Sequence, residues 1–394
     1  MLNFICAEIN YGGRVTDYND KRLIAEIMHT YLNPEMMQDG HQLSESGIYV
    51  SPEAGMQADY LNYIERLPLL ASPEVFGMHD NAEITNSQSQ TVNLLKTVLS
   101  IQPRASSKGG KSREAIIQEI ATLIESKMPK SFDLHDVKSR YQTKYEESMN
   151  TVLVQEVEKF NTLIGIINVS LYDVKRALNG FITMNDDLEK IATSLYSQQV
   201  PVSWGDIFLS EKALTPWVAE LQERVAFFKR WVDKGKPSVF WFSAFCFPQA
   251  FLTGTLQNFA RKAKVSIDRI EFDFKFLDDK KVEDISEAPE SGIYIYGLFI
   301  EGAKWNYEEH RIGRPVPKEL FSGMPVLWMI PKIDRVPPES GIYKCPVYKV
   351  TSREGSLSTT GHSTNFVRYV EIPSGKEQSE WVKAGVACFL SLRT

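Results

Sequence analysis

One aromatic run, residues 240–262, constrains the fold of this chain more than any other feature. It holds six phenylalanines and one tryptophan, reading Phe240-Trp241-Phe242-Ser243-Ala244-Phe245-Cys246-Phe247-Pro248-Gln249-Ala250-Phe251 and continuing through Phe259 to Lys262. Pro248, Gln249 and Gly254 interrupt it well before the roughly 18 apolar residues that a membrane span needs. Because so large an apolar area does not stay exposed, we expect the run to be buried against other protein and Trp241 to lie in the core.

Composition limits the class of protein. The chain has 394 residues, 43% hydrophobic and 24% charged, which is typical of a globular protein of two or three domains. A formal net charge of −6 argues against nucleic acid or anionic membrane as partners. We find no signal peptide or membrane span, and the isolated Cys6, Cys246, Cys345 and Cys388 indicate reduced thiols in a cytosolic-type compartment.

Helical periodicity covers the first two thirds of the chain. We expect a helix capped by Asp17 or Asn19 and stopped by Pro34, and a second helix ended by Pro68. Two further helices are expected around Leu94–Leu99 and after Ser112. Another should run from a cap at Thr215 to Gly235, and a last one should end with Arg261 and Lys262 in its final turn.

The longest apolar stripe runs from Leu153 to Phe181 at spacings of four and three. A free-standing coiled coil is one interpretation. Leu163, Ile166 and Val169 widen the stripe, however, which favours a helix inside a bundle, with Gly180 at its C-terminal cap.

After about residue 265 the period changes to two, which predicts strands. They are expected at Ile270–Phe276, Ile293–Tyr296, Val326–Ile330, Tyr343–Tyr348, Phe366–Ile372 and Val386–Leu392. Six such strands predict an antiparallel sheet that curls into a small or incomplete barrel.

The aromatic run closely resembles the C-terminal domain of dynein heavy chains, and further strings resemble the same family in the same order. They are Asn10–Asp17 (NYGGRVTD), Pro73–Ala82 (PEVFGMHDNA), Glu147–Glu156 (ESMNTVLVQE), Cys345–Lys349 (CPVYK) and Leu357–Val367 (LSTTGHSTNFV). The last string is similar to axonemal, inner-arm-type heavy chains.

The resemblance implies an α+β fold in three parts. Residues 1–72 would be part of the helical lid of the sixth AAA+ module, residues 73–264 the helical part of the C-terminal domain, and residues 265–394 an incomplete six-stranded antiparallel β-barrel. Because the sequence begins part-way into the lid, we expect it to belong to a far longer polypeptide.

The resemblance also implies a function. The region would be a non-catalytic structural and regulatory domain that braces the AAA+ ring of a minus-end-directed microtubule motor in the axoneme of cilia and flagella. ATP and Mg²⁺ would bind elsewhere in the parent protein. Its partners would be the rest of that ring, intermediate and light chains and, through the parent's stalk, the microtubule. An alternative is a docking module for accessory chains or axonemal components.

A second alternative is a nucleotide-binding unit at Lys111. Residues 105–112 (ASSKGGKS) match a relaxed phosphate-loop pattern, in which Lys111 would reach a phosphate and Ser112 would ligate Mg²⁺. The pattern requires a buried strand before the loop, whereas a helical stripe precedes this one. No apolar run ending in Asp follows it to hold the metal, so we favour a loop between helices.

Other polar residues carry no recognisable site. His362 lies among hydroxyl side chains, but the sequence has no G-x-S-x-G elbow, so we expect a polar loop between strands. The six histidines show no metal-ligand spacing. We therefore assign no catalytic, cofactor-binding or metal-binding residue to this protein.

Overall fold

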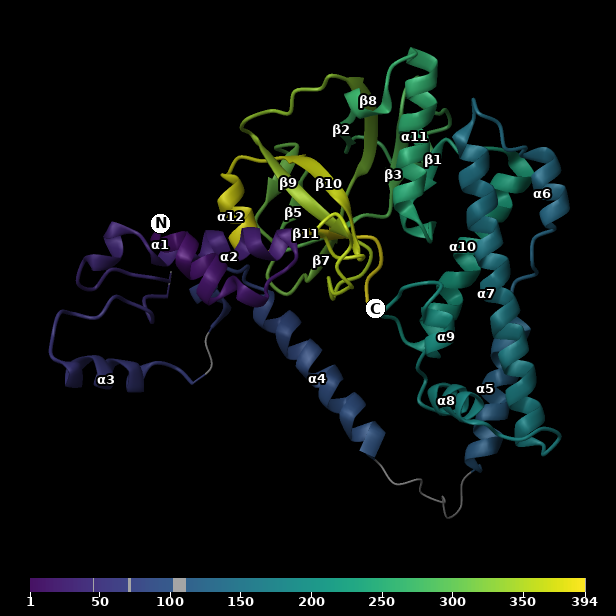
Figure 1. Ribbon diagram of the computed structural model, residues 1–394, viewed down its shortest axis with the longest axis horizontal. Coiled ribbons are helices and arrows are strands. Elements are labelled where there is room, and N and C mark those ends of the chain that lie inside the picture. The colour runs from purple at the N-terminus through teal and green to yellow at the C-terminus, as the bar shows by residue number, and fades with distance from the viewer. Residues whose placement is uncertain (45, 70–71, 102–110, 394) are drawn as a thin grey trace.

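The computed structural model describes residues 1–44, 46–69, 72–101 and 111–393. Figure 1 shows three regions: short helices at the N-terminus, a central region of strands, and a group of helices around one long helix. The helix α4 (Ala82–Ile101) runs below the strands toward the helical group, and the polypeptide returns to the strands through α11 (Pro248–Ala263). The strand region therefore lies between the two helical regions.

The N-terminal segment (residues 1–81) is built from short helices. They are α1 (Leu2–Phe4), η1 (Ile5–Asn10), η2 (Gly12–Arg14), α2 (Tyr18–Tyr31), η3 (Pro34–Met37), α3 (Gln57–Arg66) and η4 (Pro73–Phe76). Of the two predicted caps of α2, Asp17 and Asn19, the structure has Asp17, because an Asp17 side-chain oxygen accepts a hydrogen bond from the Asn19 amide. The helices expected before Pro34 and Pro68 are also confirmed.

The bundle comprises α5 to α10. Its members are α5 (Arg113–Lys127), α6 (Leu134–Arg140), α7 (Ser148–Leu178), α8 (Asp186–Tyr196), α9 (Val202–Gly205) and α10 (Leu214–Lys234). The long helix α7 contacts every other member and buries a wide stripe that includes Leu153, Phe160 and Ile167, so the bundle interpretation is confirmed. Gly180 follows α7 with φ +76°, as expected of a C-terminal cap.

The predicted start of α10 was wrong by two residues. The helix begins at Leu214, and its N-cap is Ala213, which has no side chain that could accept a hydrogen bond. Thr215 lies inside the first turn and points its hydroxyl at the Gln198 side chain, 3.1 Å away. A tertiary partner therefore replaces the local cap that the sequence indicated.

The aromatic run lies at the centre of the protein, as predicted, but Trp241 does not. Phe240, Phe242, Phe245 and Phe251 are buried, and the rings of Phe245 and Phe251 stack with centroids 4.3 Å apart. They belong to one continuous core that also includes the bundle and the strands. Trp241 is only half-buried, because it ends the edge strand β1 (Val239–Trp241), and Phe247 is 47% exposed.

Strands occupy the C-terminal third. They are β2 (Ile270–Leu277), β3 (Ile293–Tyr296), β4 (Phe299–Glu301), β5 (Lys304–Asn306), β6 (Arg311–Gly313), β7 (Phe321–Gly323), β8 (Val326–Ile333), β9 (Ile342–Tyr348), β10 (Phe366–Pro373) and β11 (Ala387–Phe389), with α12 (Gln378–Lys383) before the last. Their orders are β1-β3-β8-β2, β10-β9-β11-β4-β7 and β5-β6.

The α+β class is confirmed, but the barrel is not, because no sheet in the described residues closes. The expectation of purely antiparallel pairing was wrong, since β1 pairs with β3 and β11 pairs with β9 in parallel. Side chains bridge the gap between edge strands β2 and β10. Arg335 donates to Asp273 of β2 at 3.1 Å and to Glu371 of β10 at 3.0 Å, and Arg368 of β10 lies 4.7 Å from the Phe272 ring.

The last strand is central in its sheet. β11 pairs with β4 on one side and with β9 on the other, and all of its residues are buried. As the alternation predicts, its two faces differ. Cys388 packs into the main core, while Ala387 and Phe389 pack into a smaller cluster with Tyr348.

Candidate functional site: the joint between the N-terminal helices and the strands

In the part of the protein that the structure describes, no group of His, Cys, Asp and Glu is arranged to hold a metal ion. None of its helices is long and apolar enough to span a membrane. The polar residues of the sequence strings instead meet where α2 lies on the strand region. We call this contact the joint; it comprises Asp17, Asn19 and Arg22 with their partners in β9, β10, α12 and the loop 356–365.

Asp17 makes the first contact of the joint. One carboxylate oxygen caps α2 by accepting from the Asn19 amide at 2.8 Å, and the other accepts from the Ser363 amide at 2.5 Å. The Tyr18 amide donates to the Gly361 carbonyl at 3.0 Å. The start of α2 is therefore fixed to backbone groups of the loop 356–365.

Asn19 makes the second contact and lies between two tyrosines. Its Nδ2 donates to the Tyr348 hydroxyl at 2.9 Å, and the Tyr369 hydroxyl donates to its Oδ1. Burial raises the pKa of Tyr369 to about 12 and also raises the pKa of Tyr348. The raised pKa keeps the Tyr369 phenol protonated, as its donation to Asn19 requires, whereas the Tyr348 oxygen only accepts from Asn19.

Arg22 makes the third contact, one turn further along α2. Its guanidinium donates to the Gln378 side chain at 2.6 Å and to the Lys344 carbonyl at 3.4 Å, and it lies 6.0 Å from the Tyr343 ring. α12 and β9 thus hold the same face of α2 that Asp17 and Asn19 present.

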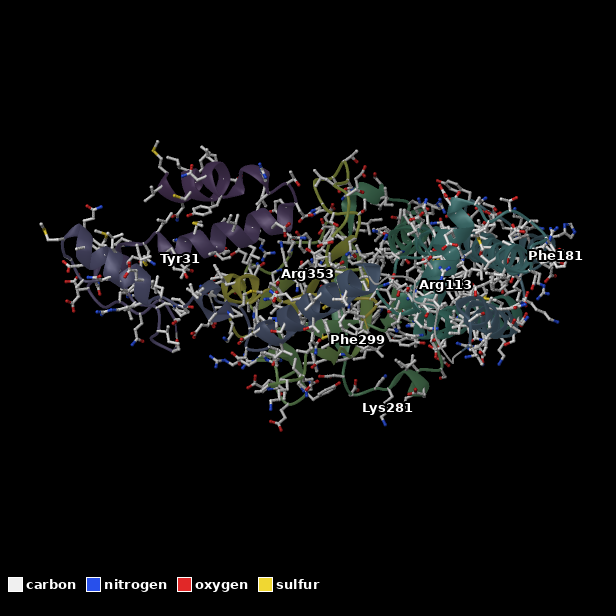
Figure 2. The ribbon with its side chains drawn as sticks, turned by 90° about the horizontal axis from the view of Figure 1, so that it is seen from below. Tyr31, Arg113, Phe181, Lys281, Phe299 and Arg353 are labelled. Carbon is white, nitrogen blue, oxygen red and sulfur yellow. The ribbon has the colours of Figure 1, made fainter. Side chains whose placement is uncertain are left out.

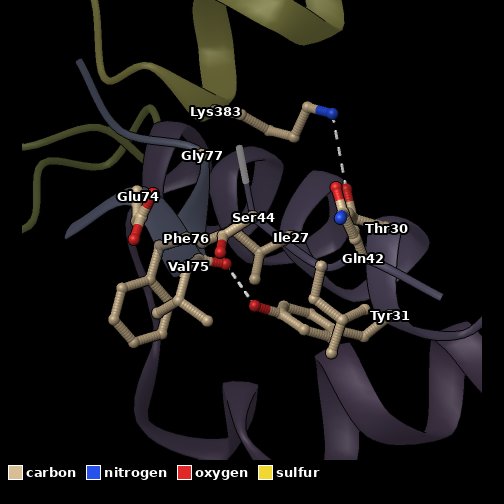
Figure 3. A pocket seen from close by; sticks show the side chains of 11 residues that line it. Ile27, Thr30, Tyr31, Gln42, Ser44, Glu74, Val75, Phe76, Gly77 and Lys383 are labelled. Atoms are coloured by element: carbon tan, nitrogen blue, oxygen red, sulfur yellow. Dashed lines mark hydrogen bonds between the residues drawn. The ribbon is translucent and has the colours of Figure 1, made fainter. Parts of the chain in front are cut away.

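A pocket of about 370 Å³ opens beside the joint (Figure 3). The Tyr31 hydroxyl donates to the Val75 carbonyl, and Lys383 of α12 points toward Thr30, with 3.4 Å between Nζ and the hydroxyl oxygen. Gly77 has φ +74°, and a Cβ there would lie 3.2 Å from Lys383. The segment after η4 therefore comes close to α12 where glycine is required.

Asn81 forms a second attachment of the N-terminal segment to the strand region. It is buried, its Nδ2 donates to the carbonyls of Val316 and Glu319 at 2.9 and 3.0 Å, and its Oδ1 accepts from the Lys318 amide at 2.7 Å. One side chain thus satisfies three backbone groups of the loop before β7. Asn81 belongs to the string Pro73–Ala82, whose polar residues were not singled out individually from the sequence.

A buried charge cluster lies next to Asn81. Glu301 of β4 accepts from Arg353 at 2.7 Å and from the Thr85 hydroxyl at 3.2 Å, and His79 lies 3.9 Å away. Arg353 also donates to the Gly385 carbonyl at 2.8 Å. Burial, supported by Arg353, lowers the pKa of His79, although Glu301 opposes the shift. Figure 2 shows Arg353 in the strand region, between the N-terminal helices and the bundle.

Comparison with known proteins shows which family this sequence belongs to. The family described as the AAA lid domain of dynein heavy chains matches residues 1–82, and the one described as the C-terminal domain of dynein heavy chains matches residues 88–390. The protein belongs to the dynein heavy chain family. The joint therefore connects a dynein AAA lid to a dynein C-terminal domain.

Several curated relatives of this dynein chain are axonemal heavy chains. It is 47% identical over 395 residues to dynein axonemal heavy chain 1 of Rattus norvegicus and 46% identical to that of Homo sapiens, covering 100% of this chain and 9% of each relative. It is 42% identical over 392 residues to dynein axonemal heavy chain 3 of Homo sapiens, covering 99% of this chain and 10% of the relative. The chain thus spans about a tenth of the length of these relatives.

Two further strings that resemble dynein, Glu147–Glu156 and the aromatic run, meet where α7 contacts α11. The Ser148 amide donates to Asn258 at 2.7 Å, and Arg261 donates to the Ser148 hydroxyl at 2.7 Å. Eight residues later, the buried Glu156 accepts from the amides of Cys246 and Phe247, both at 2.8 Å. Burial raises the pKa of Glu156, which these two amides oppose. The string Glu147–Glu156 thus attaches the bundle to the aromatic run.

The residues proposed for nucleotide chemistry have other partners. The Ser112 hydroxyl caps α5 by accepting from the Ala115 amide at 3.2 Å, and Lys111 pairs with Glu119 at 2.6 Å. Residues 105–110 of the pattern lie outside the described residues. The helix α4 precedes the loop, as the sequence predicted, where a phosphate loop needs a strand.

His362 lies in a loop, as predicted, but the loop has a structural role that the sequence did not reveal. The His362 ring stacks on Phe366 with centroids 4.3 Å apart and meets the Tyr18 ring edge-on at 5.4 Å. In the same loop, Asn365 is buried and accepts from the amides of Lys349 and Val350 at 2.8 and 3.0 Å. The loop therefore forms one side of the joint.

Proposed function

We propose that this protein is the C-terminal structural and regulatory region of an axonemal, inner-arm-type dynein heavy chain, and that it has no catalytic site of its own. The joint is the observation that carries the proposal. Asn19 is held between Tyr348 and Tyr369, and Asp17 holds the Ser363 amide, so a movement of the lid is transmitted to the C-terminal domain.

In this proposal the parent heavy chain is a minus-end-directed microtubule motor of cilia and flagella. It would bind ATP and Mg²⁺ in other modules of its ring and reach the microtubule through its stalk. Intermediate and light chains would be its further partners. The names of the axonemal relatives support the location, and the match to an AAA lid supports the ring.

The finer architecture belongs to the same proposal. Residues 1–72 would act as the lid, residues 73–264 as the helical part and residues 265–394 as an incomplete barrel. The end of α11 at Ala263 and the start of β2 at Ile270 support the second boundary. Arg335, which bridges Asp273 and Glu371, supports a barrel whose gap is filled by side chains.

The helix α4 supports a bracing role against the ring. Leu94, Leu95 and Val98 are 64%, 56% and 40% exposed on one side of this helix. An apolar stripe of this kind on a helix is typical of a surface that packs against other protein. We propose that this stripe is covered by the remaining ring of the same heavy chain.

The test compares intact full-length heavy chain with a heavy chain that ends after Gly385. Loss of β11 exposes the edges of β4 and β9, so we expect altered ATPase activity and gliding velocity. Microtubule affinity should stay unchanged in the truncated motors that remain folded. Loss of microtubule affinity with normal folding and ATPase activity would show that this region touches the track and would refute the proposal.

A further inference from the structure

A groove runs along the contact between α7 and α11, away from the joint. One section, about 570 Å³ in volume, lies between the first two turns of α7 and the length of α11, and a second section of about 550 Å³ continues past the end of α11. Tyr145, Gln257 and Arg261 line both sections, so the two form one continuous surface. We call it the α7–α11 groove.

The walls of the groove carry uncharged polar side chains from both helices, among apolar ones such as Val152 and Ala250. Thr151 and Gln155 come from α7, and Gln249, Thr253 and Gln257 come from α11. Gly254 forms part of the floor, since a Cβ there would lie 3.1 Å from Met149 and 3.2 Å from Val152. Such walls offer amide and hydroxyl groups to the backbone of a bound polypeptide.

The charged residues that line the groove are all cations. Lys144 and Arg261 line the first section, and Arg261 and Lys264 line the second, whereas no carboxylate lines either. Two carboxylates close in the sequence to lining residues have partners already: Glu147 accepts from the Asn258 amide group, and Glu156 accepts from two backbone amides. A basic surface thus lies on a protein whose formal net charge is −6.

These cations also lack acidic partners. Within the described residues, Lys144, Arg261 and Lys264 form no ion pair with a carboxylate. Arg261 instead lies 4.2 Å from the Tyr145 ring and donates to Ser148. At the other end of the groove, Lys159 lies 4.7 Å from the exposed ring of Phe247. Basic groups and aromatic rings thus mark both ends of the groove.

The length of the groove limits what can fill it. From Gln249 to Arg261, α11 extends for roughly 18 Å at about 1.5 Å per residue. An extended polypeptide advances about 3.3 Å per residue, so roughly five or six residues span this distance. We propose that the α7–α11 groove binds an extended, acidic segment of a separate polypeptide, whose carboxylates pair with Lys144, Arg261 and Lys264. This inference goes beyond the proposed function and does not depend on it.

The test measures binding of a fluorescein-labelled peptide of about eight alternating Glu and Gln residues to this protein by fluorescence anisotropy. A peptide of alternating Lys and Gln and vesicles of phosphatidylserine serve as comparison probes. The acidic peptide should bind, the basic one should not, and higher ionic strength should weaken the binding. Binding of vesicles in place of the peptide would overturn the proposal, as would equal binding of both peptides.

Charge reversal locates the binding. Lys144→Glu with Lys264→Glu changes exposed side chains only, and we expect it to weaken peptide binding by about tenfold or more with the thermal unfolding midpoint unchanged. Lys280→Glu with Lys281→Glu makes the same change of charge outside the groove and should leave binding within about twofold. Equal weakening by the two pairs would show that net charge alone attracts the peptide and would refute the site.

Discussion

Asp17 and Ser363 are 346 residues apart in the sequence, yet the Ser363 amide donates a hydrogen bond to the Asp17 carboxylate at 2.5 Å. The same carboxylate caps α2 through the Asn19 amide. One side chain thus caps the start of a helix of the lid and holds a loop of the C-terminal domain. Local helix formation and long-range attachment therefore depend on the same residue.

The first prediction concerns Asp17. Asp17→Ala removes the helix cap and leaves the Ser363 amide without its acceptor, so we expect a loss of about 1–3 kcal/mol in the free energy of unfolding. Asp17→Asn retains an oxygen for the cap and should cost less. Chemical denaturation of both variants provides the measurement. Equal stability of Asp17→Ala and the unchanged protein would refute the double role.

The second prediction concerns the aromatic run. Phe251 is fully buried and contacts the rings of Phe240, Phe242 and Phe245. Phe251→Ala should therefore cost about 3–5 kcal/mol in the free energy of unfolding. The matched control is Phe247→Ala, which removes a ring that is 47% exposed and should cost about 1 kcal/mol or less. Urea denaturation distinguishes them, and similar losses would mean that the two rings are equally buried.

The third prediction concerns pH and His79. Burial lowers its pKa below the ordinary value of 6.5, so the unfolded protein binds a proton at His79 more readily than the folded protein does. The stability that this histidine contributes is therefore present above about pH 6.5 and is lost as the pH falls. His79→Gln should reduce the loss of stability between about pH 7.5 and about pH 5.5. Identical pH dependence in the variant would show that His79 is protonated equally in both states.

The fourth prediction is that this protein does not bind Mg-ATP with micromolar affinity. Ser112 is the cap of α5, and Lys111 is paired with Glu119, so both residues have structural partners. Isothermal titration calorimetry should detect no binding, and Lys111→Ala should leave the result unchanged. Micromolar binding that disappears in Lys111→Ala would restore the nucleotide alternative.

Local sequence patterns predicted which residues form helices and strands better than they predicted which of these elements pair with one another. The stripe of α7, the Asp17 cap and the alternation of β2 were predicted, because each depends on neighbours within a few residues. The parallel pairing of β11 with β9 was not predicted, because period-two alternation is the same for either direction. Three-residue strands such as β4 and β7 are too short to show a period.

The joint was only partly predictable for the same reason. We recognised three strings from the sequence: Asn10–Asp17, Pro73–Ala82 and Leu357–Val367. The sequence did not show, however, that their residues contact distant parts of the protein. Asp17 shows why: its partner Ser363 is 346 positions away. Asn81 of the second attachment behaves in the same way, because its three hydrogen bonds go to residues more than 230 positions away. A short polar residue at a helix start has the same local pattern whether its partner is its own helix or a distant loop.

The most direct test of the account is the gliding velocity of a full-length heavy chain with the joint weakened at Asn19, measured beside its microtubule affinity. Asn19→Ala removes the hydrogen bonds to Tyr348 and Tyr369 and leaves the Asp17 cap in place. We predict reduced velocity and altered coupling to ATPase activity, with microtubule affinity within about twofold of the unchanged motor. Hydrogen exchange would show whether the joint is open in this variant. If the joint is open and both velocity and ATPase activity are unchanged, the claim that this contact transmits lid movement is contradicted.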